Sequence, residues 1–280
     1  MEQIGNNKCF GGLQKRFRFP SRTLASTTTF SIYLPPGASD YAPVPVIYWL
    51  SGLTCTDQNF VEKAGAQRYA AEYGVAVVAP DTSPRGEDIP DDSGGAWDFG
   101  VGAGYYLDAI QEPWRQHYQM YSFITRELPE LVHREFPVTH KKAIMGHSMG
   151  GHGALTIALK SPDAYTSVSA FSPICAPAES PWGQKAFTRF LGDDQSLWQE
   201  YDTCALVAEG NSKIPLLVEQ GSADNFLAEQ LQPEKLQEAC KQHHHPLDLR
   251  IRDDYDHSYF FIASFIGEHV AYHAEHLRND

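Results

Sequence analysis

The feature that most constrains the fold of this chain is a glycine-flanked serine, GHSMG at residues 146–150, which has the form G-x-S-x-G. A short apolar run at 143–145 precedes it, and a stretch rich in small residues follows at 149–159. A strand that turns this sharply into a helix needs glycines beside the turn, because side chains there would collide with neighbouring strands. The pattern therefore predicts that Ser148 sits at a strained turn, with its hydroxyl exposed at a helix N-terminus.

The rest of the chain alternates short β-branched runs with longer segments of helical periodicity. This alternation is typical of a mostly parallel sheet flanked by helices. The expected strands are 29–34, 44–50, 75–79, 143–145, 167–171, 215–219 and 247–252, and the expected helices are 59–73, 118–136, 149–159 and 258–277. With the serine turn, the pattern predicts one α/β-hydrolase domain over residues 1–280. Two long stretches, 81–116 and 173–202, are expected to be irregular and functional.

Charge and cysteine content exclude several classes of function. The chain has 22 basic and 35 acidic residues, a net charge of −13, which disfavours nucleic acid and anionic membranes as partners. Neither a secretory signal nor a membrane span is evident, so we expect a cytoplasmic protein. Its five cysteines are widely spaced without a CxxC pair, which predicts reduced thiols and no metal site. We also expect no cofactor.

A serine hydroxyl becomes an effective nucleophile only when a base takes its proton. In the α/β-hydrolase order the serine is followed by an acid and then a histidine. His257 stands just after the last expected strand and just before the final expected helix, which makes it the best base. The histidines at 243–245 precede that strand, and those at 269, 273 and 276 fall within the helix, where packing or surface roles are more common.

The acid is expected after the preceding strand, where Asp224 follows a glycine-containing turn. It would accept a hydrogen bond from Nδ1–H of His257 and fix the tautomer of that ring. Three rivals, Asp253, Asp254 and Asp256, share the loop of His257, but surface charge is the simpler interpretation for them.

The negative charge that develops during acyl transfer needs two backbone N–H donors. One is expected from Met149, the residue after the serine. The other is expected from the loop that leaves the strand at 44–50, where the sequence reads Ser-Gly-Leu and Leu53 is the candidate. Gly52 in that loop could equally be a simple turn glycine.

Seven blocks of sequence, in order along the chain, carry a resemblance to a known family: YWLSGLTCTDQNF (48–60), PDTSPRG (80–86), GAGYYLDAIQEP (102–113), GHSMGGHG (146–153), FSP (171–173), PWGQKAF (181–187) and YDHSYF (255–260). Together these blocks resemble the S-formylglutathione hydrolase family, also called esterase D. The resemblance implies a cofactor-free cytoplasmic thioesterase of glutathione-dependent formaldehyde detoxification, often homodimeric, with side activity on short carboxylic esters. It maps the triad onto Ser148, Asp224 and His257, and the oxyanion donors onto Leu53 and Met149.

Other interpretations remain open at this point. A general short-chain carboxylesterase with another physiological substrate would carry the same motifs. A non-catalytic binding protein of the same fold would lack a triad member, and none is missing here.

Four residues are candidates for contact with a glutathione thioester. Trp182 is expected to wall a shallow acyl pocket, although a structural role fits equally well. Arg85 and Lys185 could supply the cation that anionic glutathione needs. Cys55 lies beside the oxyanion loop and is expected to be a bystander to the chemistry, close to the substrate. The acidic stretch 88–98 would disfavour an anionic substrate if it faces the site.

Overall fold

The computed structural model describes residues 1–279 and is built around one nine-stranded sheet. The order of strands across the sheet is β1-β2-β3-β5-β4-β6-β7-β8-β9. Their bounds are β1 (Glu2–Cys9), β2 (Gly12–Ser21), β3 (Ser26–Leu34), β4 (Val44–Leu50), β5 (Ala76–Pro80), β6 (Val138–His147), β7 (Val168–Phe171), β8 (Leu216–Gly221) and β9 (Leu247–Arg252).

The sheet is parallel from β5 to β9 and antiparallel at its N-terminal edge. β4 pairs in parallel with β5 and β6, whereas β1, β2 and β3 form an antiparallel meander that joins β5. Central strands such as β4 and β5 are continuous apolar runs because helices cover both of their faces. This mostly parallel sheet confirms the predicted α/β-hydrolase class.

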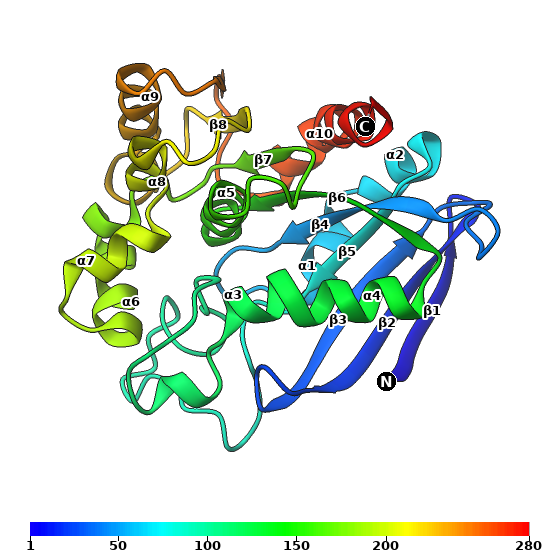
Figure 1. Ribbon diagram of the computed structural model, residues 1–280, viewed down its shortest axis with the longest axis horizontal. Coiled ribbons are helices and arrows are strands. Elements are labelled where there is room, and N and C mark those ends of the chain that lie inside the picture. Colours follow the sequence, from blue (N-terminus) through cyan, green and yellow to red (C-terminus); the bar gives the residue numbers. More distant parts are fainter. Residues whose placement is uncertain (280) are drawn as a thin grey trace.

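Helices pack on both faces of the sheet (Figure 1). One face carries α1 (Asp57–Lys63), α2 (Ala66–Tyr73) and α10 (Tyr259–Asn279), whose apolar side chains share a core with Ile47 and Trp49. The other face carries α4 (Leu128–Glu135), α5 (Met149–Lys160) and α8 (Thr203–Glu209). The remaining helices are α3 (Met120–Ser122), α6 (Pro181–Leu191), α7 (Gln195–Trp198) and α9 (Pro233–Gln242). No helix within residues 1–279 is long and apolar enough to cross a membrane.

Several sequence expectations need correction. The expected helix at 59–73 is two helices, α1 and α2, separated at Gly65, where φ is 69°. The stretch 173–202 is not irregular, because it contains α6 and α7. The start of α6 has a normal signal, since the side chain of Ser180 accepts a hydrogen bond from Gly183 N and Pro181 occupies the first turn. The strands β1 and β2 were not expected at all.

The sheet gathers the candidate residues at the carboxyl ends of its strands. The Gly52 loop follows β4, Ser148 follows β6, Asp224 follows β8 and His257 follows β9. Because parallel strands end at the same edge of a sheet, these four loops meet there. The fold thereby brings together residues that are up to about 200 positions apart in sequence.

Candidate active site

Ser148 occupies the strained turn that its motif predicts. Its backbone has φ 58° and ψ −121°, and the residue begins α5 as its N-cap. The flanking glycines are required by close contacts: a β-carbon at Gly146 would stand 2.2 Å from the carbonyl oxygen of Gly150, and one at Gly150 would stand 2.0 Å from that of Leu50. The turn is fixed further by Ser148 N, which donates to the carbonyl of Phe171 at 2.9 Å. Strain of this kind persists only where surrounding structure imposes it, and it is common at active sites.

Asp224 and His257 form a close pair. Nδ1 of His257 lies 2.6 Å from Oδ2 of Asp224, and the carboxylate side chain is fully buried. The other oxygen, Oδ1, accepts from Phe226 N at 2.9 Å. Burial acts to raise the pKa of Asp224, but the hydrogen bond from His257 and its charge outweigh burial, so this pKa is lowered from its usual value. The aspartate is therefore ionised at neutral pH and holds Nδ1 of His257 as a donor.

Of the three rival carboxylates, one makes a local contact with Ser258 and two are exposed. Asp256 Oδ1 accepts from the backbone and the hydroxyl of Ser258, and thereby orders the start of α10. Asp253 and Asp254 are exposed. Within residues 1–279, only Asp224 accepts a hydrogen bond from the ring of His257.

The two expected oxyanion donors belong to the two segments that meet at Ser148. Gly52 lies against the nucleophile, since a β-carbon at residue 52 would stand 3.1 Å from Ser148 Cβ. Leu53 follows Gly52, and Met149 is the first residue of α5. Among the described residues, neither Leu53 N–H nor Met149 N–H donates to another protein group. Both donors are thus free, and the positive end of α5 adds to them.

Ser148 and His257 line one cavity of about 270 Å³. In residues 1–279 the Ser148 hydroxyl forms no hydrogen bond with His257, which is common before substrate binds. The full lining is Gly52, Leu53, Cys55, Asn59, Lys63, Trp97, His147, Ser148, Trp182, Phe226, His257, Ser258 and Tyr259.

Ring contacts divide the cavity wall into two sides with His257 between them. On one side Trp97 packs on Trp182 at 5.4 Å between centroids, Trp182 packs on Phe226 at 4.8 Å, and Phe226 packs on His257 at 5.0 Å. On the other side the ring centroid of His147 lies 4.5 Å from that of His257 and 6.2 Å from that of Tyr259. Lys63 Nζ is in turn 5.8 Å from the Tyr259 ring. The cavity therefore has an apolar aromatic side and a polar side.

Of the four residues expected to contact a glutathione thioester, two line the cavity and two do not. Trp182 and Cys55 line the cavity. Burial, the largest influence, raises the pKa of the Cys55 thiol. Arg85 does not line the cavity: its Nε is 2.9 Å from Asp81 Oδ1 and it donates to the carbonyl of Cys55. Lys185 is also outside the lining and is paired with Asp98 at 2.6 Å.

The acidic stretch 88–98 is tied to α6 by ion pairs. Asp98 pairs with Lys185, and Asp92 pairs with Arg189, so these carboxylates are partly neutralised. Trp97 between them is held at the rim of the cavity against Trp182. The stretch therefore contributes an aromatic wall, which its composition did not indicate.

His147 is a lining residue that sequence reasoning missed. It is 6% exposed, and neither of its ring nitrogens has a hydrogen-bond partner among residues 1–279. Burial first, and then the neighbouring His257, lower its pKa well below the usual value, so the ring is neutral. Its position as the second residue of the GHSMG motif was the available signal. Asn59, Lys63 and Tyr259 were also missed, because only the tertiary fold brings α1 and α10 to the serine. Phe226, two residues after Asp224, was missed as well.

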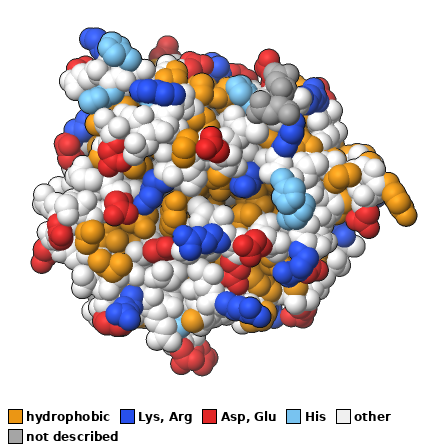
Figure 2. All heavy atoms as spheres, in the orientation of Figure 1, with side chains coloured by type: hydrophobic (Ala, Val, Ile, Leu, Met, Phe, Trp, Pro, Cys, Tyr) orange, Lys and Arg blue, Asp and Glu red, His pale blue; other side chains and the backbone are white. Residues whose placement is uncertain are grey.

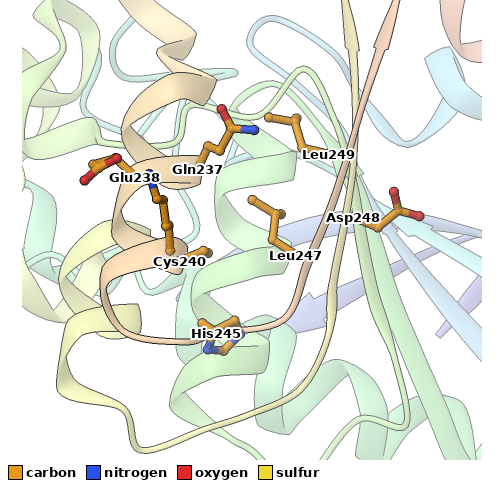
Figure 3. A pocket seen from close by; sticks show the side chains of 8 residues that line it. Gln237, Glu238, Cys240, His245, Leu247, Asp248 and Leu249 are labelled. Carbon is orange, nitrogen blue, oxygen red and sulfur yellow. The ribbon is translucent and has the colours of Figure 1, made fainter.

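A larger groove, of about 670 Å³, lies between α9 and β9 (Figure 3). Its wall includes Cys240, His245 and Asp248, shown as sticks in the figure. Burial raises the pKa of Cys240 to about 11, so this thiol is protonated at neutral pH and a poor nucleophile. His245 is a possible base in the groove, but among the described residues that line it no activated nucleophile stands beside it. In residues 1–279 no group of three or more His, Cys, Asp or Glu side chains could hold a metal ion.

A serine at such an elbow, with an oriented histidine and two free amides nearby, suits acyl transfer to water, and the sheet that carries it has the α/β-hydrolase fold. By class, the protein is a serine esterase. A model of the family described as "Putative esterase" matches residues 21–272.

Similarity to solved structures shows which family of serine esterases the chain belongs to. An S-formylglutathione hydrolase of Agrobacterium tumefaciens is 49% identical, with 99% of this chain and 100% of that chain covered and a TM-score of 0.96. The chain therefore belongs to the S-formylglutathione hydrolase family. A fluorophosphonate-binding serine hydrolase of Staphylococcus aureus, 21% identical over 94% of this chain and 98% of that chain, has a TM-score of 0.75. A ferulic acid esterase, 18% identical over 96% and 100%, has a TM-score of 0.74. These two show the shared fold.

Proposed function

We propose that this chain hydrolyses S-formylglutathione to formate and glutathione, with Ser148, His257 and Asp224 as its catalytic triad. The 2.6 Å contact between Asp224 and His257, in a cavity that Ser148 also lines, carries this proposal. The 49% identity with the Agrobacterium tumefaciens enzyme supports the choice of substrate. The reaction belongs to glutathione-dependent formaldehyde detoxification.

Acylation begins at Ser148. Its Oγ attacks the formyl carbon while Nε2 of His257 takes the hydroxyl proton, and Asp224 stabilises the imidazolium that forms. The carbonyl oxygen becomes an oxyanion between Leu53 N–H and Met149 N–H. When the tetrahedral intermediate collapses, the C–S bond breaks and His257 returns its proton to the sulfur. Glutathione leaves as a thiol, and the formyl group remains on Ser148 as an ester.

Deacylation repeats these steps with water. His257 takes a proton from water, the hydroxide oxygen attacks the formyl carbon, and the same two amides hold the oxyanion. The C–O bond to Ser148 then breaks, and His257 protonates the serine oxygen. Formic acid leaves and loses its remaining proton to solvent as formate, and the enzyme is restored. No redox step occurs, and we expect no cofactor to be needed.

Short carboxylic esters fit the same chemistry, because an alcohol leaves in place of the thiol. A general short-chain carboxylesterase is therefore the second candidate, and the esterase family match supports it equally. The two candidate functions differ in whether the enzyme prefers the glutathione thioester to simple esters. A dedicated S-formylglutathione hydrolase should show a kcat/KM for that thioester well above those for p-nitrophenyl formate and acetate. Similar values for all three would favour the general esterase.

The nucleophile is tested separately. A fluorophosphonate probe should label the wild-type protein at Ser148 and leave Ser148→Ala unlabelled, and that variant should lose on the order of 10⁴-fold or more in kcat. Labelling at another residue, or near-full activity of Ser148→Ala, would overturn the mechanism.

The family resemblance also supports a cytoplasmic homodimer, and the five free cysteines of the structure suit a reducing compartment. Sedimentation equilibrium across a range of protein concentrations tests the dimer directly. A mass equal to one chain at all concentrations would rule it out.

A further inference from the structure

We propose that Lys63 and Asn59, on the cavity side of α1, bind a carboxylate of the glutathione leaving group. This inference rests on the proposed function and names the residues that recognise its substrate. The sequence suggested Arg85 and Lys185 as the cations that bind glutathione. In the structure, however, Arg85 forms an ion pair with Asp81 and Lys185 forms one with Asp98.

Lys63 is the unpaired cation of the cavity. It forms no ion pair with any carboxylate in residues 1–279, whereas Lys160, Lys185 and Lys235 do. None of the described lining residues is Asp, Glu or Arg, so Lys63 carries the formal charge of the cavity when the histidines are neutral. Its side chain is exposed at the mouth, where a long substrate would emerge.

Asn59 provides an oriented donor one helical turn away. Its Oδ1 accepts from Thr56 N at 2.8 Å as part of the capping box that begins α1. With its oxygen fixed in this way, the amide presents its NH₂ group, which has no hydrogen-bond partner among the described residues. Residues four apart on a helix lie on the same face, so Asn59 and Lys63 can hold one carboxylate together.

The position of this pair along the cavity suits a leaving group. The sequence of contacts from His257 through His147 and Tyr259 to Lys63 places the cation on the polar side, away from the aromatic side of Trp182 and Phe226. A thioester bound at Ser148 must direct its acyl group and its thiol group in different directions. The small apolar acyl group suits the aromatic side, and the peptide-like thiol suits the polar side.

The overall charge of the protein does not attract an anionic substrate, so a local cation would aid its binding. Glutathione carries more carboxylates than ammonium groups at neutral pH, and the chain has a net charge of −13. The face shown in Figure 2 mixes red and blue side chains rather than presenting a basic field that would attract an anion. A local contact at the cavity can supply the attraction that the overall charge does not.

The test compares Lys63→Gln and Asn59→Asp with the wild type on S-formylglutathione and on p-nitrophenyl acetate. Aspartate at residue 59 keeps an oxygen for the capping box but replaces the donor with a negative charge. We expect each variant to lower the ratio of kcat/KM for the thioester to kcat/KM for the neutral ester, by about fivefold for Lys63→Gln and more for Asn59→Asp, through a higher thioester KM. Lys63→Arg should recover most of the ratio.

Two controls make the outcome specific. Lys241 lines the groove between α9 and β9 that Figure 3 shows. Lys241→Gln should leave kcat/KM unchanged for both the thioester and the neutral ester. Raising the ionic strength from about 0.01 M to 0.15 M should narrow the difference in thioester KM between the wild type and Lys63→Gln, because screening weakens the contact that only the wild type makes. An unchanged ratio in Lys63→Gln would overturn the inference. A wild-type protein that does not hydrolyse S-formylglutathione would instead overturn the proposed function.

Discussion

Gly52 lies so close to Ser148 that a β-carbon at residue 52 would stand 3.1 Å from the Cβ of the serine. The same added carbon would be 3.3 Å from the Nδ1 of His147. The absence of a side chain at residue 52 therefore lets the loop that carries Leu53, a proposed oxyanion donor, approach the nucleophile closely. This contact connects the β4 loop to the β6 elbow.

We predict that Gly52→Ala lowers kcat by about 10- to 100-fold while the protein stays folded. The added methyl group would push the loop outward by a few tenths of an ångström, and a displaced oxyanion donor costs about as much as a removed one. Steady-state kinetics on p-nitrophenyl acetate measure the effect. Gly5→Ala is the matched control. Gly5 lies on the edge strand β1, outside the cavity, and its added carbon would meet Arg16 Cβ on β2 at a similar 3.2 Å. Equal losses in both variants would indicate a general effect on folding.

The choice of acid is open to a direct comparison. Asp224→Asn should lower kcat by roughly 10³- to 10⁴-fold, because the amide cannot hold His257 in the correct tautomer or stabilise its charged form. Asp256→Asn should leave kcat within about threefold, since that residue orders Ser258 at the start of α10. Thermal denaturation shows whether either protein is unfolded. A silent Asp224→Asn with an inactive Asp256→Asn would reverse the assignment.

Trp182 should limit the length of the acyl group. It is 7% exposed and, together with Phe226, walls the aromatic side of the cavity. For the wild type we expect kcat/KM to fall steeply from formyl to hexanoyl esters, because a clash costs more than the ~1 kcal/mol that each accommodated methylene adds. Trp182→Ala should raise the hexanoyl-to-acetyl ratio by at least about tenfold. A ratio unchanged in a folded Trp182→Ala protein would mean that this tryptophan is only structural.

The serine turn and most strands were predictable because their signals are local. The G-x-S-x-G motif specifies its own turn, and the apolar runs at β4 and β5 specify buried strands. The edge strand β1 was not recognised because its residues are largely exposed and polar, without the alternation that marks a half-buried strand. The start of α6 at Ser180 and Pro181 was visible in the sequence but was overlooked within a long apparent loop.

The sequence alone could not predict which charged residues form ion pairs with each other. Arg85 and Lys185 lie in the right loops for contact with an anion, yet each meets an aspartate that the fold brings to it, Asp81 or Asp98. Lys63 had no distinguishing pattern, because its place at the cavity depends on how α1 packs against the sheet and α10. A motif thus indicates the proposed reacting groups, whereas the residues proposed to set specificity come together only through tertiary contacts.

The last prediction concerns Cys55, whose thiol lines the cavity two residues beyond Leu53. Cysteine is a stronger intrinsic nucleophile than serine, but Cys55 lacks an elbow, and burial raises the pKa of its thiol above the usual value of 9.0. We therefore expect Cys55→Ser to keep turnover of p-nitrophenyl acetate within about threefold. Loss of turnover in a folded Cys55→Ser protein would require a different mechanism.

A bulky maleimide should nevertheless inactivate the wild-type protein, because an adduct on Cys55 fills the cavity of about 270 Å³. Only the thiolate reacts, and with a raised pKa the thiolate fraction is small at pH 7 and increases about tenfold per pH unit below that pKa. The inactivation rate should therefore increase from pH 6 to pH 8, and Cys55→Ser should resist at every pH. Inactivation of Cys55→Ser at the wild-type rate would place the sensitive thiol elsewhere, at Cys9 or Cys204, which are also partly exposed.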